Sequence, residues 1–587
     1  MSNQPINKTE PFFSLYYEKD GYDIKGKRIM GRQAAGWSFL KSIIQSQKYN
    51  RLGFYLKNSD QKELLKEDIT SLLTEDNKSI DLEYMSYSNV DQIQSYGGIM
   101  LPGPDLNEFS YARSYYGHNK YSLCGITHTT ASHTVMSSIS NLLTSAIMPW
   151  DAIICTSDSV LQTVNKIIEA QAKFLSFRYD KKIDFLPQLP IIPLGINNDE
   201  FNFSDEYKVN SRKELSIEKD DIVIVFVGRL SFHAKAHHVP MYTALEACAK
   251  ELQGNRKIHL IQTGWFANDT IANTFKTEAQ KICPSINCIF LDGTNQENKS
   301  KTLAAGDIFM SLSDNIQETF GLTPLEGMSA GLPVIVSDWN GYRSTVRDNI
   351  DGFRIKTYSL PSGYGEELAF NYMIGKISYD YYIAHSVQKT SIDVEDCINK
   401  LKLLIFNDDK RIELSTNGKQ RALNDFSWNK ILDKYEELYK ELDDIRVSQS
   451  DGYKEFCKPY LPSDRLDPFF IFEEYPSVVL NADLKFKKTG NIQELSINDI
   501  INLDSVNYSK NNLPSVEFIG EVLTQLNINE YYSIRDLIES NKYEENEIFK
   551  VIIFLLKYGF ISTIESKWVK QKKYYFFIKT FQVSISI

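Results

Sequence analysis

The sequence predicts an α/β protein built on doubly wound parallel sheets, and three observations support that prediction. A chain of 587 residues is too long for one hydrophobic core and suggests three or four domains, at about 150 residues per domain. Residues 222–227 form a continuous apolar, β-branched run, which is typical of a strand buried on both faces. Apolar runs and helical segments then alternate up to residue 337, and strand–helix–strand repetition requires parallel pairing.

The overall composition argues against several classes of protein. A net charge of −11 argues against a general binder of nucleic acid or anionic membranes, although a local basic pocket is still compatible with it. Seven cysteines without metal-site spacing are typical of reduced thiols. The polar N-terminus lacks the apolar core of a signal peptide, and no apolar run approaches the ~20 residues that span a bilayer. We therefore expect a cytoplasmic protein, and peripheral membrane contact through an amphipathic patch stays an open alternative.

Residues 1–200 mix short apolar runs with helical segments, and we assign them to a first α/β domain. Near its start, Gly31 and Gly36 stand ahead of an apolar-periodic helix. This pattern predicts a tight loop that brings backbone N–H groups toward a phosphate. Glycines before helices are common, so an ordinary helix start is the alternative.

A second candidate in this domain is His128. It follows a predicted strand that begins at Ser122 and runs into a loop rich in hydroxyl side chains. Strand ends in open parallel sheets are where ligands bind. An imidazole there can exchange a proton near neutral pH or hold a sugar hydroxyl as a neutral group. The alternative is a histidine whose hydrogen bonds are satisfied by neighbouring backbone.

Residues 201–426 form the second predicted domain. The expected strands are 222–227, 258–262, 288–291, 308–312 and 334–337. Gly264 and Gly293 end or follow two of these strands, where a nucleobase pocket is commonly lined. Arg229 and Lys235 follow the first strand, and an arginine and a lysine at the carboxyl end of a strand can bind phosphate oxygens. The alternative is a pair of solvated surface charges.

Two glutamates, Glu318 and Glu326, enclose seven residues in a stretch that the rest of the chain is organised around. Pro324 suits an opening helical turn, so Glu326 lies near the start of a predicted helix. The amides of Phe320, Gly321 and Leu322 would then point at an anion such as a diphosphate. An acidic residue one turn into such a helix can accept hydrogen bonds from a ribose. The alternative is one loop glutamate and one exposed helical glutamate.

These motifs together resemble the retaining, nucleotide-sugar-dependent glycosyltransferases of family four. The resemblance rests on the Glu-x7-Glu spacing, on Phe-Gly-Leu at 320–322 and on Ala-Gly-Leu-Pro-Val-Ile at 330–335, and it covers roughly residues 25–445. It implies two facing Rossmann-like domains, the GT-B architecture, with the site in the cleft. It also implies that a helix at 427–446 crosses back onto the first domain.

The resemblance further implies a role for each candidate residue. Arg229 and Lys235 would neutralise the donor diphosphate, and a loop bearing Gly36 would face it from the first domain. Glu326 would hold the ribose, Glu318 the sugar hydroxyls, and His128 the sugar beside the reaction centre. Three features depart from the family. Lys235 stands one position further along than in many relatives, the loop near Gly36 lacks the usual paired glycines, and Asn340 stands where the first glycine of a strand-end pair would be.

The expected function is that of a hexosyltransferase-type enzyme. It would move a sugar from a nucleoside diphosphate sugar to an unidentified acceptor with retention at the anomeric carbon. We expect no metal or other cofactor, because two cations would neutralise the leaving group and no carboxylate cluster suggests a metal site. Two alternatives stay open: a non-catalytic regulator that binds a sugar nucleotide and DNA, and a phosphorylase that uses inorganic phosphate.

Residues 450–587 lie outside the resemblance. Their pattern of helices and strands predicts an accessory winged-helix-like domain. Helical patterns at 515–526, 533–539 and 545–557 precede strand-like runs at 560–564 and 574–578. A basic wing would consist of Lys567, Lys570, Lys572 and Lys573. Three glutamates at the start of the third helix would repel a DNA groove, so we expect no nucleic-acid binding and interpret the module as a protein-docking or structural element.

Overall fold

The computed structural model describes residues 12–24, 26, 31–73, 80–252, 256–463, 465–490, 494–540 and 543–564. The chain divides into two compact units, residues 1–465 and 466–587, and each is described by itself. Among the described residues, no helix is both long enough and apolar enough to cross a bilayer.

The first sheet of the large unit contains six parallel strands in the order β3-β2-β1-β4-β5-β6. The strands are β1 Ser14–Tyr16, β2 Arg51–Tyr55, β3 Asp81–Met85, β4 Gly98–Met100, β5 Ser122–Ile126 and β6 Ala152–Ile154. The helices of this part are α1 Gly31–Gln45, α2 Gln61–Leu72, α3 Val90–Ser95, α4 Asn107–Ser114, α5 His133–Asn141 and α6 Asp158–Tyr179. The strand order reverses between β1 and β4, which places a crevice at the carboxyl ends of these two strands.

The second sheet repeats this plan with the order β12-β11-β10-β7-β8-β9, again all parallel. Its strands are β7 Ile222–Val227, β8 Ile258–Gly264, β9 Asn287–Asp292, β10 Ile308–Ser311, β11 Val334–Ser337 and β12 Gly352–Ile355. The helices are α7 Asp205–Glu214, α8 His238–Ala249, α9 Asp269–Ile282, α10 Gln296–Ala305, α11 Leu322–Ser329 and α12 Tyr342–Thr345. The prediction of two Rossmann-like domains, each a doubly wound parallel sheet, is therefore confirmed.

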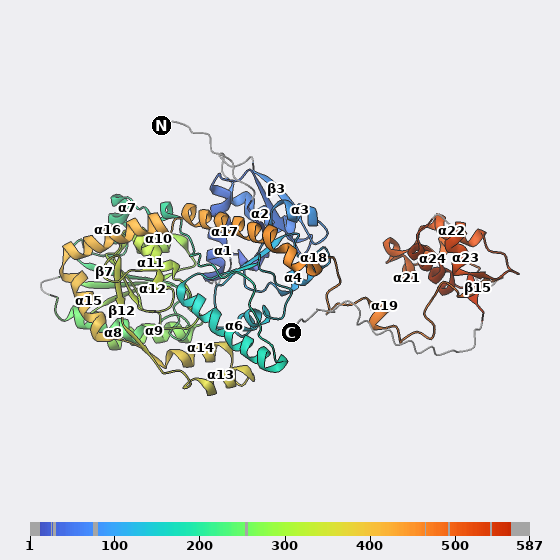
Figure 1. The fold of residues 1–587 in the computed structure, drawn as a ribbon. Helices are drawn as coiled ribbons and strands as arrows, with labels where there is room; N and C mark the ends of the chain where they lie inside the picture. Colours follow the sequence, from blue (N-terminus) through green and yellow to red (C-terminus); the bar gives the residue numbers. More distant parts are fainter. Residues whose placement is uncertain are drawn as a thin grey trace. The chain divides into compact units, whose positions relative to one another are not determined.

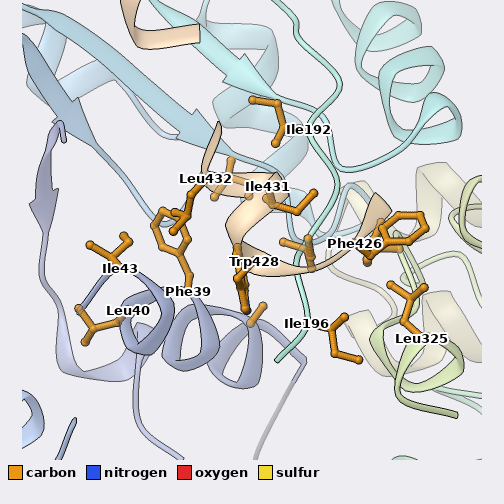
Figure 2. Close-up of a cluster of buried hydrophobic side chains, with 14 of the residues drawn as sticks. Phe39, Leu40, Ile43, Ile192, Ile196, Leu325, Phe426, Trp428, Ile431 and Leu432 are labelled. Atoms are coloured by element: carbon orange, nitrogen blue, oxygen red, sulfur yellow. The ribbon is translucent and has the colours of Figure 1, made fainter. Parts of the chain in front are cut away.

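Three further helices of the large unit follow the second sheet: α15 Val394–Phe406, α16 Asp408–Asp425 and α17 Trp428–Gln449. Helix α17 runs over α1 of the first sheet (Figure 1). Figure 2 shows Trp428, Ile431 and Leu432 beside Phe39 and Leu40 in one buried cluster. The Trp428 indole also donates a 2.7 Å hydrogen bond to the Ser38 hydroxyl. Apolar packing thus holds α17, which follows the second sheet in the chain, against α1 of the first domain.

A helical hairpin is inserted after β12. It consists of β13 Thr357–Ser359, α13 Glu366–Met373, α14 Tyr379–Val387 and β14 Thr390–Ile392, and β13 and β14 pair antiparallel (Figure 1). Helix α13 has no buried residue, whereas α14 buries Ile383 and Val387. The sequence analysis did not identify this insertion.

The small unit has a three-stranded antiparallel sheet in the order β16-β15-β17. Its strands are β15 Lys485–Lys488, β16 Tyr532–Ser533 and β17 Ile561–Thr563, and its main helices are α22 Val516–Thr524, α23 Ile534–Ser540 and α24 Glu545–Lys557. The three predicted helices and the strand expected at 560–564 are present. Strand β15 was not expected. The strand expected at 574–578 and the proposed basic wing lie outside the described residues, so the winged-helix likeness stays a prediction.

Candidate functional site

Glycines stand at the carboxyl ends of β7, β8 and β9, where the three strands pack closely against one another. A Cβ atom on Gly264 would overlap the carbonyl oxygen of Gly228, and one on Gly293 would lie 2.6 Å from the Gly264 Cα atom. Backbone hydrogen bonds join the same strand ends, from Gly228 N–H to the Thr263 carbonyl at 3.0 Å and from Gly293 N–H to the Gly264 carbonyl at 2.9 Å. Only glycine fits at Gly264 and Gly293, because backbone occupies the space of a side chain. The two glycines are therefore required by the close packing of backbone on backbone at these strand ends.

Arg229 follows β7 at the same edge and is held in place by its own loop. Its guanidinium donates a 2.7 Å hydrogen bond to the Ala234 carbonyl and lies 5.8 Å from the ring centroid of Trp265. Burial lowers the pKa of Arg229, and the nearby Asp380 carboxylate opposes this shift. A guanidinium remains charged at neutral pH, so Arg229 is a fixed, partly buried cation.

Lys235 forms an ion pair with Glu318. Both side chains are largely buried, with 20% of Lys235 and 11% of Glu318 exposed. Burial alone would lower the pKa of Lys235, but the Glu318 carboxylate outweighs it and the pKa is raised. The structure thus brings together two residues to which the sequence analysis gave separate partners. If a ligand binds Lys235 or Glu318, that residue must bind the ligand in addition to its ion-pair partner or in place of it.

Helix α11 begins at Leu322, two residues before Pro324, and Gly321 precedes it with a left-handed φ of 98°. The Tyr342 ring fills the space that a Cβ atom on Gly321 would need, so both backbone angle and packing require glycine there. Within the described part of the chain, no hydrogen bond engages the N–H groups of Phe320, Gly321 and Leu322. Three amides are therefore available at the start of this helix.

Glu326 lies on α11 and is paired with Lys299 of α10. One carboxylate oxygen, Oε1, accepts a 2.6 Å hydrogen bond from the Lys299 ammonium. The other, Oε2, is buried and has no hydrogen-bond partner among the described residues. Lys299 was not identified from the sequence, because a lone lysine in a polar helix start gives no recognisable signal.

The first domain reaches this edge through the loop after β5. The His128 carbonyl accepts a 2.9 Å hydrogen bond from the Thr319 hydroxyl, and the Thr319 carbonyl accepts one of the same length from the Ser157 hydroxyl. Thr319 therefore joins the His128 loop to the stretch that carries Glu318. Burial, aided by the positive charge of Arg32, lowers the pKa of His128 to about 4, so its imidazole is neutral at physiological pH.

Gly36 does not lie in a loop, which corrects the prediction made for it. It lies within α1, beyond the first four residues described for this helix, so its N–H is engaged inside the helix and cannot contact a phosphate. A Cβ atom there would overlap the Gly21 carbonyl oxygen, so the glycine is required by the close approach of α1 to a neighbouring turn. Gly36 and His128 do line one small cavity, together with Tyr22, Phe39, Met100 and Pro102.

The inserted hairpin supplies residues that the sequence analysis missed. The Tyr372 hydroxyl accepts a 2.9 Å hydrogen bond from the His133 N–H at the start of α5. The Tyr379 hydroxyl donates to Gln317 at 3.3 Å, beside Glu318. The hairpin therefore contacts the first domain at His133 and the second domain beside Glu318. The only sequence signal was a local enrichment in tyrosine between residues 372 and 382.

Within the described residues, no group of three or more histidine, cysteine, aspartate or glutamate side chains is arranged to hold a metal ion. What this edge does provide is a fixed arginine, helix-start amides without a hydrogen-bond partner among the described residues, and an unpaired carboxylate oxygen. Such a set can accept a ligand that carries both an anionic group and hydroxyl donors.

A comparison with protein families finds a match over residues 208–366 to the model described as glycosyl transferases group 1. In curated proteins, the chain is 27% identical over 172 residues to an uncharacterized glycosyltransferase of Methanocaldococcus jannaschii, covering 28% of this chain and 40% of that protein. It is 25% identical over 168 residues to the D-inositol 3-phosphate glycosyltransferase of Geodermatophilus obscurus, covering 28% of this chain and 36% of that protein. The matched part thus spans about two fifths of these relatives or less.

Among solved structures, the chain is similar to Anabaena HepE in complex with UDP and glucose, at 13% identity and a TM-score of 0.47, covering 74% of this chain and all of the other. It is also similar to a sucrose-phosphate synthase of Thermosynechococcus elongatus, at 14% identity and a TM-score of 0.45, covering 74% of this chain and 99% of the other.

Proposed function

We propose that this chain is a glycosyltransferase that moves a sugar from a nucleoside diphosphate sugar to an acceptor, with retention at the anomeric carbon. The observation that carries the proposal is the gathering of Arg229, the Lys235–Glu318 pair and the free amides before α11 at one sheet edge. The match of residues 208–366 to a glycosyl transferase model supports it, since that range includes all of these residues. So do relatives that are themselves glycosyltransferases.

In the proposed complex, the diphosphate binds Arg229 and the amides of Phe320, Gly321 and Leu322. Arginine offers a planar fork to phosphate oxygens, and helix-start amides favour an anion. Glu326 accepts hydrogen bonds from the ribose. The nucleobase lies beside the strand ends that carry Gly264 and Gly293.

In the proposed reaction, the bond between the anomeric carbon and the diphosphate oxygen breaks while the acceptor oxygen forms a bond to the same face of that carbon. The acceptor proton passes to the departing diphosphate oxygen. Negative charge grows on the leaving group, so fixed cations at Arg229 and Lys235 lower the barrier. Glu318 holds sugar hydroxyls and shares Lys235 with the diphosphate, and the neutral imidazole of His128 acts as a hydrogen-bonding group beside the sugar. No metal is part of this proposal.

The first test is nucleoside diphosphate release by the full chain from UDP-, GDP- and ADP-sugars. We expect release from one donor class and a loss of at least ~100-fold in Glu318→Gln, the scale of removing one charge-stabilising group. Glu413→Gln, an exposed glutamate that pairs with Lys410, is the matched control and should behave as the wild type. Binding of a donor without release would instead favour the regulator, and release only with inorganic phosphate and an oligosaccharide would favour the phosphorylase.

Retention has its own readout. NMR of the sugar freed by slow donor hydrolysis reports its anomeric form before mutarotation. The proposal expects the donor's own anomer. The opposite anomer would overturn retention and leave the transfer itself standing.

A further inference from the structure

The Glu326 carboxylate is only half paired. Its Oε1 atom is bound by Lys299 at 2.6 Å, and its Oε2 atom is buried without a hydrogen-bond partner among the residues described. Only 13% of the glutamate side chain is exposed. A buried acceptor left without a donor is destabilising, and more so when it is charged. An oxygen kept in this state is suited to a hydrogen-bond donor on a ligand.

Lys299 is itself held from two sides. Its side chain is 20% exposed, and its ammonium lies 5.4 Å from the ring centroid of Phe201, in the 3-10 helix Asn198–Phe201. An ammonium over an aromatic face is attracted by the ring. The cation is thus fixed between the Phe201 ring and one carboxylate oxygen. It fixes the rotation of the Glu326 carboxylate and leaves Oε2 on the unpaired side.

A second unpaired atom lies one turn away. The hydroxyl oxygen of Thr323 is also buried and without a hydrogen-bond partner in the described residues. Thr323 and Glu326 are three residues apart on α11, so their side chains lie on the same face of the helix. Two neighbouring polar atoms of this kind match two neighbouring hydroxyl groups on one ring.

We propose that Lys299 is a positioning residue for ribose recognition: it holds Glu326 so that Oε2, together with the Thr323 hydroxyl, binds the vicinal 2′- and 3′-hydroxyls of the donor. The pair thereby selects ribonucleotides over 2′-deoxyribonucleotides. This inference rests on the proposed function, since it assumes that a nucleoside diphosphate sugar binds at this edge.

The test measures dissociation constants by calorimetry on the full chain. The probes are whichever of UDP, GDP and ADP binds best, and its 2′-deoxy form. The wild type should prefer the ribonucleotide by about tenfold, the equivalent of one hydrogen bond of ~1.4 kcal/mol. Lys299→Met should reduce this preference to about twofold or less, and Lys299→Arg, which keeps the cation, should restore part of it.

Lys301→Met is the matched control. Lys301 lies on the same helix, has a similarly buried side chain at 18% exposure, and pairs with Glu214 instead of Glu326. This variant should keep the wild-type preference. If Lys299→Met weakens both nucleotides equally and leaves their ratio unchanged, Lys299 is only structural and the inference is wrong.

Thr323→Val provides a second variant if Lys299→Met does not fold, because it replaces a hydroxyl with a methyl group of the same shape. It should also reduce the preference, and an unchanged ratio would contradict the paired arrangement. The two levels of failure are distinct. If no nucleoside diphosphate binds the wild type, the proposed function fails as well; if they bind but the ratio ignores Lys299, only this inference fails.

Discussion

The two domains hold their candidate groups in different ways. On the second domain, the candidate groups are fixed by partners at the same sheet edge: Arg229 by a carbonyl of its own loop, and Lys235 by Glu318. On the first domain, the backbone carbonyl of His128 accepts a hydrogen bond from Thr319, and the inserted hairpin contacts His133. Binding an anion needs fixed charges and amides without a hydrogen-bond partner, which short motifs can supply. The first domain depends on contacts between segments that are distant in sequence.

The largest expected effect tests whether the second domain binds the anion through Arg229. Arg229→Ala should reduce nucleoside diphosphate release by at least ~100-fold, because it removes a preorganised charge from the leaving group. Arg256→Ala is the control, since Arg256 is exposed and bonds only the Asp220 carbonyl in the described structure. Unchanged release by Arg229→Ala would mean that the diphosphate lies elsewhere.

The free energy of unfolding provides a second comparison of the two domains, at Gly264 in the second domain and Gly36 in the first. Gly264→Ala and Gly36→Ala both place a Cβ atom against a backbone carbonyl oxygen, and each should cost about 1–3 kcal/mol in urea unfolding. Only Gly264→Ala should also weaken nucleotide binding, since Gly36 has no free amide. Gly520→Ala is the control: Gly520 lies in α22 with open space around its Cβ position, so alanine should stabilise by ~0.5–1 kcal/mol. If Gly36→Ala also weakened nucleotide binding, Gly36 would be part of the nucleotide site after all.

The pH dependence of stability tests the neutral state of His128. Its pKa is lowered from 6.5 to about 4 in the folded chain, so the unfolded state binds more protons within this window. The contribution of His128 to stability is therefore complete above pH 6.5 and decreases as the pH falls toward 4. His128→Gln should lose less stability than the wild type between pH 6.5 and 4.5, by about 1–2 kcal/mol.

The other histidines are common to both proteins, so the difference isolates His128. Two parallel stability curves would mean that the imidazole is accessible to water and free to be protonated. In that case its proposed role as a neutral group beside the sugar would no longer hold.

The smallest expected effect concerns the hairpin. Tyr372→Phe removes the acceptor for the His133 N–H and should cost about 0.5–1.5 kcal/mol of hairpin docking, seen as faster amide exchange at His133. Donor hydrolysis should change by less than about threefold. Tyr381→Phe is the control, because that side chain is 63% exposed. Equal exchange in both variants would show that the hydroxyl contact does not hold the hairpin.

The sequence was informative where local chemistry decides the structure. Continuous apolar runs such as 222–227 predicted the strands of the second sheet, and the Glu-x7-Glu spacing placed Glu318 and Glu326 around the start of α11. The proposed site roles themselves stay predictions. What could not be predicted depends on tertiary contact. Gly36 was assigned to a loop because the turn packed against α1 leaves no local signal.

The ion pairs of the candidate site were the other feature that the sequence could not predict. Nothing in the sequence reveals that Lys235 meets Glu318, or that Lys299 and Glu326 come together from two different helices. Such pairs depend on how α10 and α11 lie against the sheet. The same reason explains why the hairpin tyrosines were missed, since their partners lie in the first domain and beside Glu318.

The most direct test of the account is the contribution of the second phosphate to binding. Calorimetry should compare a nucleoside diphosphate with the corresponding monophosphate on the wild type and on Arg229→Ala. We predict that the wild type binds the diphosphate at least ~10-fold more tightly, and that Arg229→Ala removes most of this preference. Equal affinities in the wild type, or a preference that survives the loss of Arg229, would contradict the claim that fixed cations at this sheet edge hold a diphosphate.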